Sequence, residues 1–434
     1  MTTLASMFKR ILMLAAGVLL GAVFSVAALQ VGAAWNLFPS RELSRSAAYV
    51  KEVMQLVNEN YVDEPSVSYD TLTKRALHGM VETLDPHSEF LEAKDNQEFE
   101  EDITGEFGGI GIQVETRQGQ AIVIVPIAGT PGERAGIQRG DQLVSIDGKM
   151  LDSGAAIDSI VSRLRGKPKT KVALSLYRPT TQETLNLTLM REVIKVESVR
   201  DVHVIDRDVG YIQLTEFSDH TGAQFSRALE RLLKEGIQSL VLDLRNNPGG
   251  LLDAAVEVAE PFFNKNELIV YTQGRKAADR EDYRAEWDGA PIKLPLAILI
   301  NANSASAAEV VTGALKDTGR AVVVGERSFG KGSVQSVFKL KNGEGMRLTT
   351  ARYYTPSGLS IHEKGIAPHV ELVMTPEEDR KVARQRMRPD ITDPNEFKTR
   401  FGFEPVPDRQ LQAALDVLKG VRLVGEGAPG SNAQ

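Results

Sequence analysis

The chain has 434 residues and contains no cysteine, so disulfide bridges, thiolate metal sites and a cysteine nucleophile are excluded. Only 6 histidines are present, and none stands in a Ser-His-Asp or H-E-x-x-H spacing. The sequence therefore predicts neither a metal site nor a cofactor. A basic stripe is also missing, because the 51 lysines and arginines are scattered and the formal net charge is −7. Both features argue against a nucleic-acid partner.

One long apolar run is present, from Ile11 to Leu29, and it follows Lys9 and Arg10. A basic flank before such a run is typical of an export signal. The run is also just long enough to span a bilayer, so cleavage and retention as an anchor both remain open. We expect residues 1–35 to be a signal peptide or a membrane anchor.

Hydrophobic periodicity divides the rest of the chain into parts. Helical spacing recurs over residues 36–100, and short β-branched runs with glycine punctuation follow over residues 104–190. Continuous apolar strands alternate with helices over residues 195–375, which predicts a sheet covered on both faces. A charged, helical segment at 376–424 precedes a tail at 425–434 that we expect to be disordered. The sequence thus predicts a multidomain α+β protein.

Two serines follow the predicted strand "LPLAILIN" and precede a helix expected to begin near Ala305. Ser304 and Ser306 therefore lie at a strand-to-helix turn, where unpaired N–H groups stabilise an alkoxide or an oxyanion. The alternative interpretation is structural, because Ser306 and Glu309 also match a capping box.

A lysine follows in "GKGSVQ", after a buried-looking strand. In an extended segment Lys331, Ser333 and Gln335 point to one side. A lysine acts as a base for serine only if burial or positive potential lowers its pKa. Gln335 would hold the amine without adding charge. The alternative for Lys331 alone is a solvated strand end.

Two glycine-rich loops have the composition of anion-binding loops. In "DLRNNPGG", Gly249 and Gly250 allow N–H groups to converge on an oxyanion. In "EFGGIGIQVE", Gly108, Gly109 and Gly111 precede a strand, as a loop for a terminal carboxylate requires. The helix expected at Ala155 to Leu164 would form the other wall of this peptide groove.

Six motifs in order, "LDPHSEFL", "GEFGGIGI", "RAGIQRGDQLVSIDG", "DLRNNPGG", "SASAAE" and "GKGSVQ", resemble the carboxy-terminal processing peptidases, which use a Ser-Lys mechanism. The resemblance covers about residues 40–375. It implies that Ser306 rather than Ser304 is the nucleophile, that Lys331 is the base and that Gln335 supports it. It further implies a crotonase-like and Clp-protease-like α/β catalytic core with an inserted PDZ domain.

The same resemblance implies several binding residues. The oxyanion hole would use N–H groups at Gly249, Gly250 and Ala307. The PDZ residues that receive a substrate tail with a free, apolar C-terminus would be Gly108, Gly109, Ile110, Gly111, Ile112 and Arg165. Relatives usually carry serine or proline before "AERAGI", so Gly132 leaves the start of that PDZ helix open.

The resemblance also implies a location and partners. The protein would be exported to the bacterial periplasm or cell envelope, with membrane contact through residues 11–34. It would form a homo-oligomer and could use a lipoprotein adaptor. Two other classes remain open: a non-catalytic PDZ adaptor or chaperone, and an acyl-CoA enzyme of the crotonase type, which has no use for a PDZ domain or for export.

Overall fold

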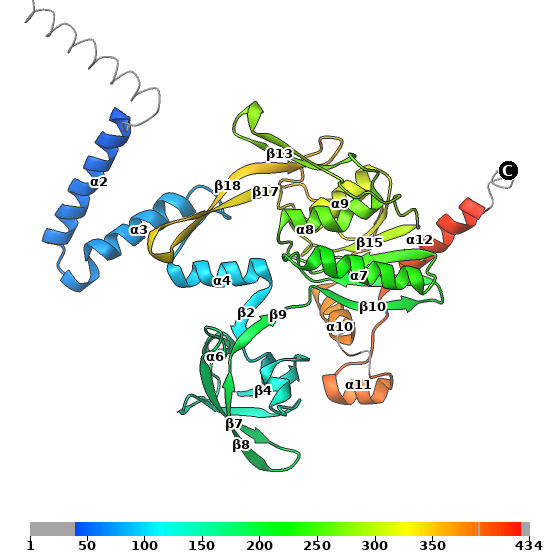
Figure 1. Ribbon diagram of the computed structural model, residues 1–434, viewed down its shortest axis with the longest axis horizontal. Helices are drawn as coiled ribbons and strands as arrows, with labels where there is room; N and C mark the ends of the chain where they lie inside the picture. Colours follow the sequence, from blue (N-terminus) through cyan, green and yellow to red (C-terminus); the bar gives the residue numbers. More distant parts are fainter. Residues whose placement is uncertain (1–39, 118, 387, 389–390, 427–434) are drawn as a thin grey trace, which may run out of the picture. The chain divides into compact units, whose positions relative to one another are not determined.

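The structure is a computed structural model that describes residues 40–117, 119–386, 388 and 391–426 (Figure 1). The predicted export segment lies outside these residues, as does most of the predicted tail. The chain forms two compact units, one up to Leu84 and one from Asp85 onward. In the described part of the chain, no helix is long and apolar enough to cross a membrane.

The first unit contains helix α2 (Arg41–Asn60), a 3-10 turn (Glu64–Ser66) and helix α3 (Tyr69–Glu82). The hydroxyls of Ser40 and Ser68 cap the two helices by accepting the N–H groups of Leu43 and Thr71. Pro65 lies in the turn between the helices.

The second unit contains a six-stranded sheet in the order β10-β11-β12-β15-β16-β19. Neighbours from β11 to β19 pair in parallel, and β10 adds an antiparallel edge. The central strands β12 and β15 are buried at every position, which explains their continuous apolar sequence. The strands are β10 (Val199–Ile205), β11 (Val209–Leu214), β12 (Ser239–Asp243), β15 (Leu296–Ile300), β16 (Val322–Gly325) and β19 (Val370–Glu371).

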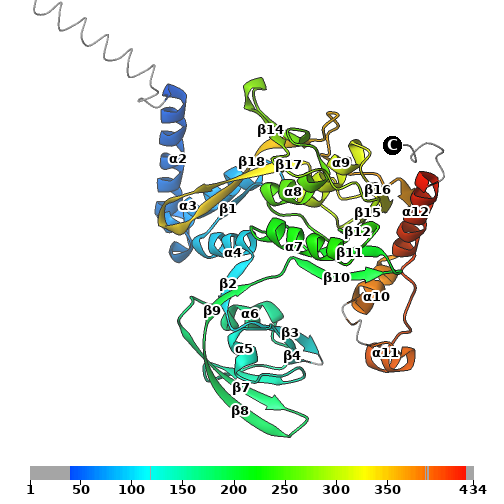
Figure 2. The same ribbon diagram turned by 45° about the vertical axis from the view of Figure 1, so that its right-hand side comes forward.

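Helices cover both faces of this sheet, as the sequence predicted. Leu240 and Leu242 of β12 pack in one apolar cluster with residues of α7, α8 and α9. Val241, between them, points to the other face and packs with Ala414 and Leu418 of α12. Figure 2 shows α12 on the side of β12 and β15 away from α8 and α9. The helices are α7 (Thr221–Lys234), α8 (Leu252–Ala259), α9 (Ala307–Asp317) and α12 (Arg409–Glu426).

A five-stranded antiparallel sheet lies beside the first sheet, with the order β1-β18-β13-β14 and β17 paired to β18. The β17–β18 hairpin contacts helix α4 (Ala93–Thr104), where Lys339 pairs with Glu100 at 2.8 Å. The division after Leu84 places β1 and α4 in the second unit, although we expected them in an N-terminal helical region. The strands are β1 (Glu89–Leu91), β13 (Leu268–Gly274), β14 (Arg280–Arg284), β17 (Ser333–Lys339) and β18 (Gly345–Tyr354).

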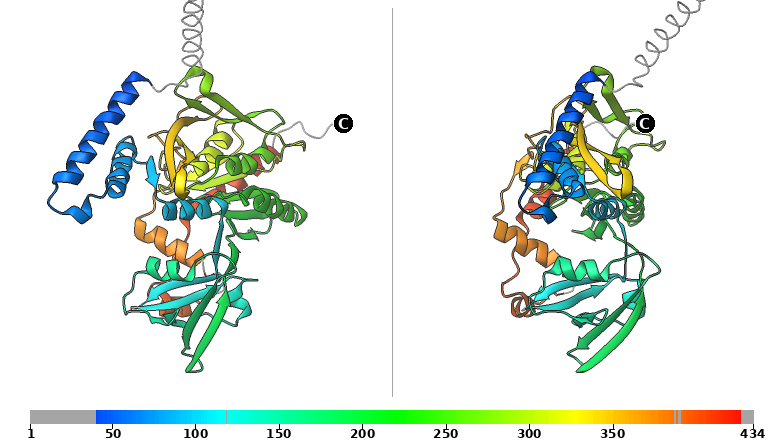
Figure 3. Two further views of the ribbon diagram at one scale, coloured as in Figure 1. Left: turned by 60° about the vertical axis from the view of Figure 1, so that its left-hand side comes forward. Right: turned by 90° about the vertical axis from the view of Figure 1, so that its left-hand side faces the viewer.

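A small β domain is inserted between α4 and β10. Its sheet has the order β3-β4-β5-β7-β8, with β6 beside β5, and its own apolar core. The segments that enter and leave this domain, β2 and β9, pair as an antiparallel two-stranded ribbon (Figure 3). Next to the ribbon, the N–H of Val196 donates to the carbonyl of Gly105 at 2.8 Å. Its elements are β2 (Glu106–Gly109), β3 (Ile112–Arg117), β4 (Gln120–Pro126), α5 (Pro131–Arg134), β5 (Gln142–Ile146), β6 (Lys149–Met150), α6 (Ile157–Leu164), β7 (Lys171–Arg178), β8 (Glu183–Met190) and β9 (Glu192–Lys195).

The C-terminal segment is helical, with α10 (Pro376–Arg386), α11 (Pro394–Phe401) and α12. Helix α12 continues to Glu426, two residues into the predicted disordered tail. The helix continues because the first helix-stopping proline after it is Pro429.

Candidate active site

The turn between β15 and α9 holds Ser306 in a strained conformation. Its φ is +54° and its ψ is −116°, and its side chain is nearly buried. This conformation also explains why α9 begins at Ala307, later than the sequence predicted. A Cβ on Gly249 would stand 2.6 Å from the Cβ of Ser306, so only glycine lets the "NNPGG" loop approach the turn this closely.

Ser304 and Ser306 have different environments. Ser304 is fully buried, and its hydroxyl donates to the carbonyl of Leu244 at 2.8 Å and accepts the N–H of Asn301 at 2.9 Å. Its oxygen is therefore occupied by the fold. The hydroxyl of Ser306 instead lies beside the phenol of Tyr353 and lowers the pKa of that phenol.

Tyr353 is buried, and burial raises the pKa of its phenol to about 12, although the Ser306 hydroxyl acts in the opposite direction. The phenol is thus protonated at neutral pH and is available as a donor. The N–H of Tyr353 donates to the carbonyl of Gly332 at 2.8 Å. This backbone hydrogen bond joins β18 to the loop that carries Lys331.

Glu309 joins the serine turn to the lysine loop. It is completely buried, and its Oε2 accepts the N–H of Ser306 at 2.9 Å and the N–H of Lys331 at 2.8 Å. Its Oε1 accepts the N–H of Gly330 at 2.7 Å and the hydroxyl of Ser328 at 2.5 Å. Burial raises the pKa of this carboxyl, and these hydrogen bonds oppose the rise.

The ammonium of Lys331 is in an environment that disfavours its charge. Burial lowers its pKa, the positive charge of Arg347 lowers it further, and the charge of Glu309 acts in the opposite direction. A depressed pKa is the property that a general base requires of a lysine. Among the residues that the structure describes, no hydrogen bond links Lys331 Nζ to Ser306 Oγ.

Gln335 lies near the predicted lysine but is bonded elsewhere. Its Nε2 donates to Ser333 Oγ at 2.8 Å and lies 3.5 Å from Thr349 Oγ1. Ser333 and Gln335 therefore do lie on one side of β17, as predicted. Lys331 precedes the first residue of this strand, so strand alternation does not determine the direction of its side chain.

Two of the three predicted oxyanion donors have no acceptor in the described part of the chain: the N–H groups of Gly250 and Ala307. The N–H of Gly249 donates to Asn247 Oδ1 at 2.8 Å and is thus engaged within its own loop. Ala307 is the first residue of α9, so its N–H also carries the positive end of the helix dipole.

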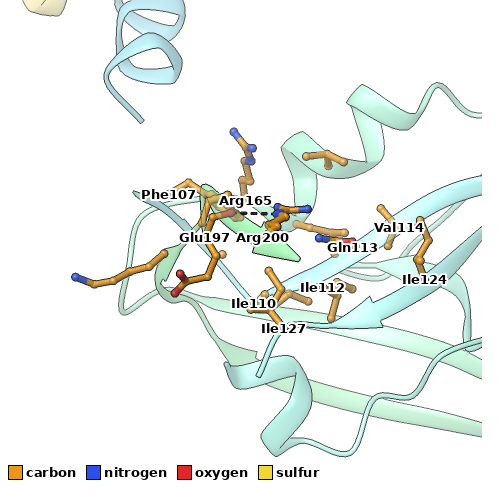
Figure 4. Close-up of a pocket in the computed structure, with 16 residues that line it drawn as sticks. Phe107, Ile110, Ile112, Gln113, Val114, Ile124, Ile127, Arg165, Glu197 and Arg200 are labelled. Atoms are coloured by element: carbon orange, nitrogen blue, oxygen red, sulfur yellow. Dashed lines mark hydrogen bonds between the residues drawn. The ribbon is translucent and has the colours of Figure 1, made fainter. Parts of the chain in front are cut away.

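The inserted β domain has a cavity of about 530 Å³ between β3 and α6, where the sequence predicted a peptide groove (Figure 4). Gly109, Ile110, Gly111, Ile112 and Arg165 line it, whereas Gly108 pairs with β9. The apolar wall is formed mainly by Phe107, Ile110, Ile112, Ile124, Ile127, Val161 and Leu164.

Gly132 is the second residue of the short helix α5, which starts at Pro131. Its N–H donates to the carbonyl of Ile110 at 2.7 Å, and a Cβ here would stand 2.6 Å from Ile112 Cγ2. The unusual glycine thus permits α5 to pack directly against the carboxylate loop.

Four residues near these sites were not assigned a role from the sequence: Tyr353, Arg347 and Arg200, and Glu309 beyond its capping pattern. The capping box was a signal for Glu309, but its contacts with Gly330 and Lys331 come from a loop more than 20 residues away. Nothing in the sequence around Tyr353, Arg347 or Arg200 distinguishes them from ordinary strand residues.

Comparison with known proteins agrees with this architecture. A family model described as peptidase family S41 matches residues 208–372, and a PDZ domain model matches residues 108–189. The chain is 34% identical over 429 residues to a carboxy-terminal-processing protease of Bartonella bacilliformis, covering 95% of this chain and 96% of the relative. It is 37% identical over 326 residues to a probable CtpA-like serine protease of Staphylococcus aureus, covering 74% of this chain and 64% of that relative.

Among solved structures, the photosystem II D1 C-terminal processing protease is similar at 30% identity and a TM-score of 0.45, over 75% of this chain and 92% of that one. The alignment with the Bartonella relative covers nearly the full length of both proteins, and it shows the family of this chain. The chain belongs to peptidase family S41 and is a carboxy-terminal-processing serine protease with a PDZ domain.

Proposed function

We propose that Ser306 is the nucleophile and Lys331 the general base of this protease. The neutral amine of Lys331 takes the proton of Ser306 as the serine oxygen attacks the scissile carbonyl. The resulting ammonium then returns the proton to the leaving amine. A water molecule, activated by the same amine, releases the acyl-enzyme in the second half of the reaction.

One observation carries this assignment: the N–H groups of Ser306 and Lys331 donate to the same oxygen of the buried Glu309. The two residues are far apart in the sequence, yet one carboxylate fixes both backbones. The oxyanion donors of the proposal are the N–H groups of Gly250 and Ala307, because both have no acceptor in the described part of the chain. Gly249 would contribute only after its hydrogen bond to Asn247 breaks. In the proposal, the side-chain amide of Gln335 leaves Ser333 and forms a hydrogen bond with the amine of Lys331.

The two neighbouring serines provide the test. Ser306→Ala should abolish peptide cleavage and covalent labelling by a fluorophosphonate probe, with an unchanged melting temperature. Ser304→Ala should still label, at a stability cost of about 1–3 kcal/mol, because it leaves the carbonyl of Leu244 and the N–H of Asn301 unpaired. Labelling of Ser306→Ala together with loss of labelling in Ser304→Ala would reverse the assignment.

The substrates of the proposal are polypeptides with a free, apolar C-terminus. The groove joins an apolar wall to a loop in which the N–H groups of Ile110 and Gly111 have no acceptor among the described residues. Such a loop captures a terminal carboxylate while the edge of β3 pairs with the chain. The PDZ domain would hold the tail while the upstream chain reaches Ser306.

The proposed location is the bacterial cell envelope, where exported proteins are the substrates. The support is the basic, then apolar sequence of residues 9–29. Self-association, a lipoprotein adaptor and membrane contact through residues 11–34 remain part of the proposal on the family resemblance alone. Fractionation of cells that produce the full chain would test the location.

A further inference from the structure

The peptide groove is not built by the PDZ domain alone. Its lining includes Lys195, Val196 and Glu197 of the segment that leaves the domain, and Arg200, which belongs to β10 of the catalytic core. Figure 4 shows Arg200 beside Arg165 and close to Ile110, at the end of the groove where β3 begins. A peptide that fills the groove would therefore lie against the core as well.

Three cations line this end of the groove, and two of them are already paired. Lys195 contacts Glu106 Oε1 at 2.9 Å. Arg165 lies 3.7 Å from Glu101 Oε2 and stacks 4.3 Å above the ring of Phe107. Both positive charges are thus partly neutralised before any ligand binds.

Arg200 is different, because its Nε donates to the main-chain carbonyl of Glu197 at 3.0 Å and it forms no ion pair with another described residue. The hydrogen bond fixes the guanidinium but uses only one donor, so its two amino groups remain available. The charge of Arg200 acts on the carboxyl of Glu216, but burial is the larger cause there and raises the pKa of Glu216.

We propose that Arg200 of the core binds the terminal carboxylate of the substrate tail, opposite the N–H groups of Ile110 and Gly111. The inference rests on the proposed tail recognition by the PDZ domain and adds the core as the second half of that site. Arginine offers a carboxylate two parallel N–H donors together with a full positive charge, which backbone amides lack. The ligand class is a polypeptide with a free α-carboxylate and an apolar last side chain.

The geometry has a consequence for coupling between the two domains. A bound carboxylate would connect the PDZ loop directly to β10, the edge strand of the sheet that positions Ser306. Tail binding would therefore favour the arrangement in which PDZ domain and core are in contact.

The test measures binding of a fluorescent peptide with an apolar C-terminus by anisotropy, in the Ser306→Ala full chain so that the peptide is not consumed. The same peptide with an amidated end is measured in parallel. Arg200→Gln should weaken binding of the free-acid peptide about fivefold to tenfold and leave the amidated peptide unchanged, because only the first offers a charge to the guanidinium. Arg227→Gln, an exposed arginine of α7 outside the groove, is the matched control and should change neither affinity.

Two results would overturn the inference and are distinguishable. In the first, Arg200→Gln lowers the affinity for both peptides equally or for neither, while the protein with Arg200 still prefers the free-acid peptide. Arg200 is then not the carboxylate partner, and tail recognition by the PDZ domain stands. In the second, the protein that retains Arg200 binds both peptides with equal affinity. The proposed tail recognition then fails, and the role of Arg200 fails with it.

Discussion

At the scale of single residues, Arg347 carries a like charge that helps to set the pH at which Lys331 is neutral. The charge of Arg347 lowers the pKa of Lys331, after burial, which is the larger cause. Removing this charge should allow Lys331 to hold its proton to a higher pH. Arg347→Gln should therefore move the rise of kcat/KM with pH to more alkaline values, as measured over a pH series on one peptide substrate.

The control is Arg352→Gln, which removes an exposed arginine of the same strand that is not among the charges acting on Lys331. It should leave the profile in place. Lys331→Arg should be inactive at every pH, because a guanidinium does not deprotonate in proteins. An unmoved profile in Arg347→Gln would mean that the titration belongs to another group.

Tyr353 gives a second prediction at this scale. Its phenol lies beside the hydroxyl of Ser306, and burial raises the pKa of this phenol to about 12. Tyr353→Phe keeps the buried ring and removes only the donor. We expect kcat to fall about tenfold or more with a small change in KM, because the donor acts where charge develops. Tyr354→Phe is the matched control, since that ring stacks on Tyr271 at 5.0 Å. Equal activity in both variants would make Tyr353 a packing residue.

At the scale of elements, the C-terminal helices hold the loop that leads to the oxyanion donors. Arg245 is completely buried, and its two amino groups contact the carboxylate of Asp408 at 2.8 Å each. On the other side, Asp379 of α10 accepts hydrogen bonds from Asn246 at 3.3 Å and from Asn301 at 3.4 Å. The loop before Gly249 thus depends on residues more than 100 positions later.

This arrangement separates a stability effect from a catalytic effect. Asp408→Ala should lower the free energy of unfolding by about 3–5 kcal/mol, since it leaves buried Arg245 with only part of its partners. Asp379→Ala should instead lower kcat about threefold to tenfold with little change in melting temperature, because two long hydrogen bonds at a half-buried site contribute little stability.

Glu377→Ala on the same helix is the control for Asp379→Ala, since Glu377 pairs with Lys381 on the surface. It should change neither kcat nor melting temperature. A drop in kcat equal to that of Asp379→Ala would show that α10 matters as a helix and not through Asp379. Steady-state kinetics and thermal unfolding of the three variants decide between these outcomes.

At the scale of the whole molecule, the inserted domain leaves and re-enters the core at one point. The N–H of Val196 meets the carbonyl of Gly105 at 2.8 Å, so a few glycines can replace residues 106–195 without stretching the chain. The domain also has its own apolar core, separate from that of the catalytic sheet. We expect the shortened protein to fold and to react with a fluorophosphonate.

The shortened protein should cleave a long peptide without distinguishing a free from an amidated C-terminus, and the full chain should prefer the free acid. Initial rates on the two peptides measure this difference. An unchanged preference after the excision would place tail recognition in the core.

The sequence by itself indicated the class of protein, a serine peptidase with an inserted PDZ domain. Local signals were sufficient for the elements, because apolar alternation and glycine loops depend on neighbours within a few positions. The order of the six short motifs along the chain added the resemblance to the family. The local signals predicted the covered sheet and the inserted β domain, both of which the structure contains. They placed Ser306 at a strand-to-helix turn, although the helix starts two residues later than expected, because the backbone of Ser306 is not helical.

Only the tertiary structure decided which groups meet across large separations. The packing of whole elements places Glu309 against the Lys331 loop. It also brings Tyr353 beside Ser306 and Asp379 within hydrogen-bonding distance of Asn246. The engagement of the Gly249 N–H by Asn247 is likewise a property of the folded loop. No sequence pattern encodes such contacts, since each depends on the position of an element that folds far away along the chain.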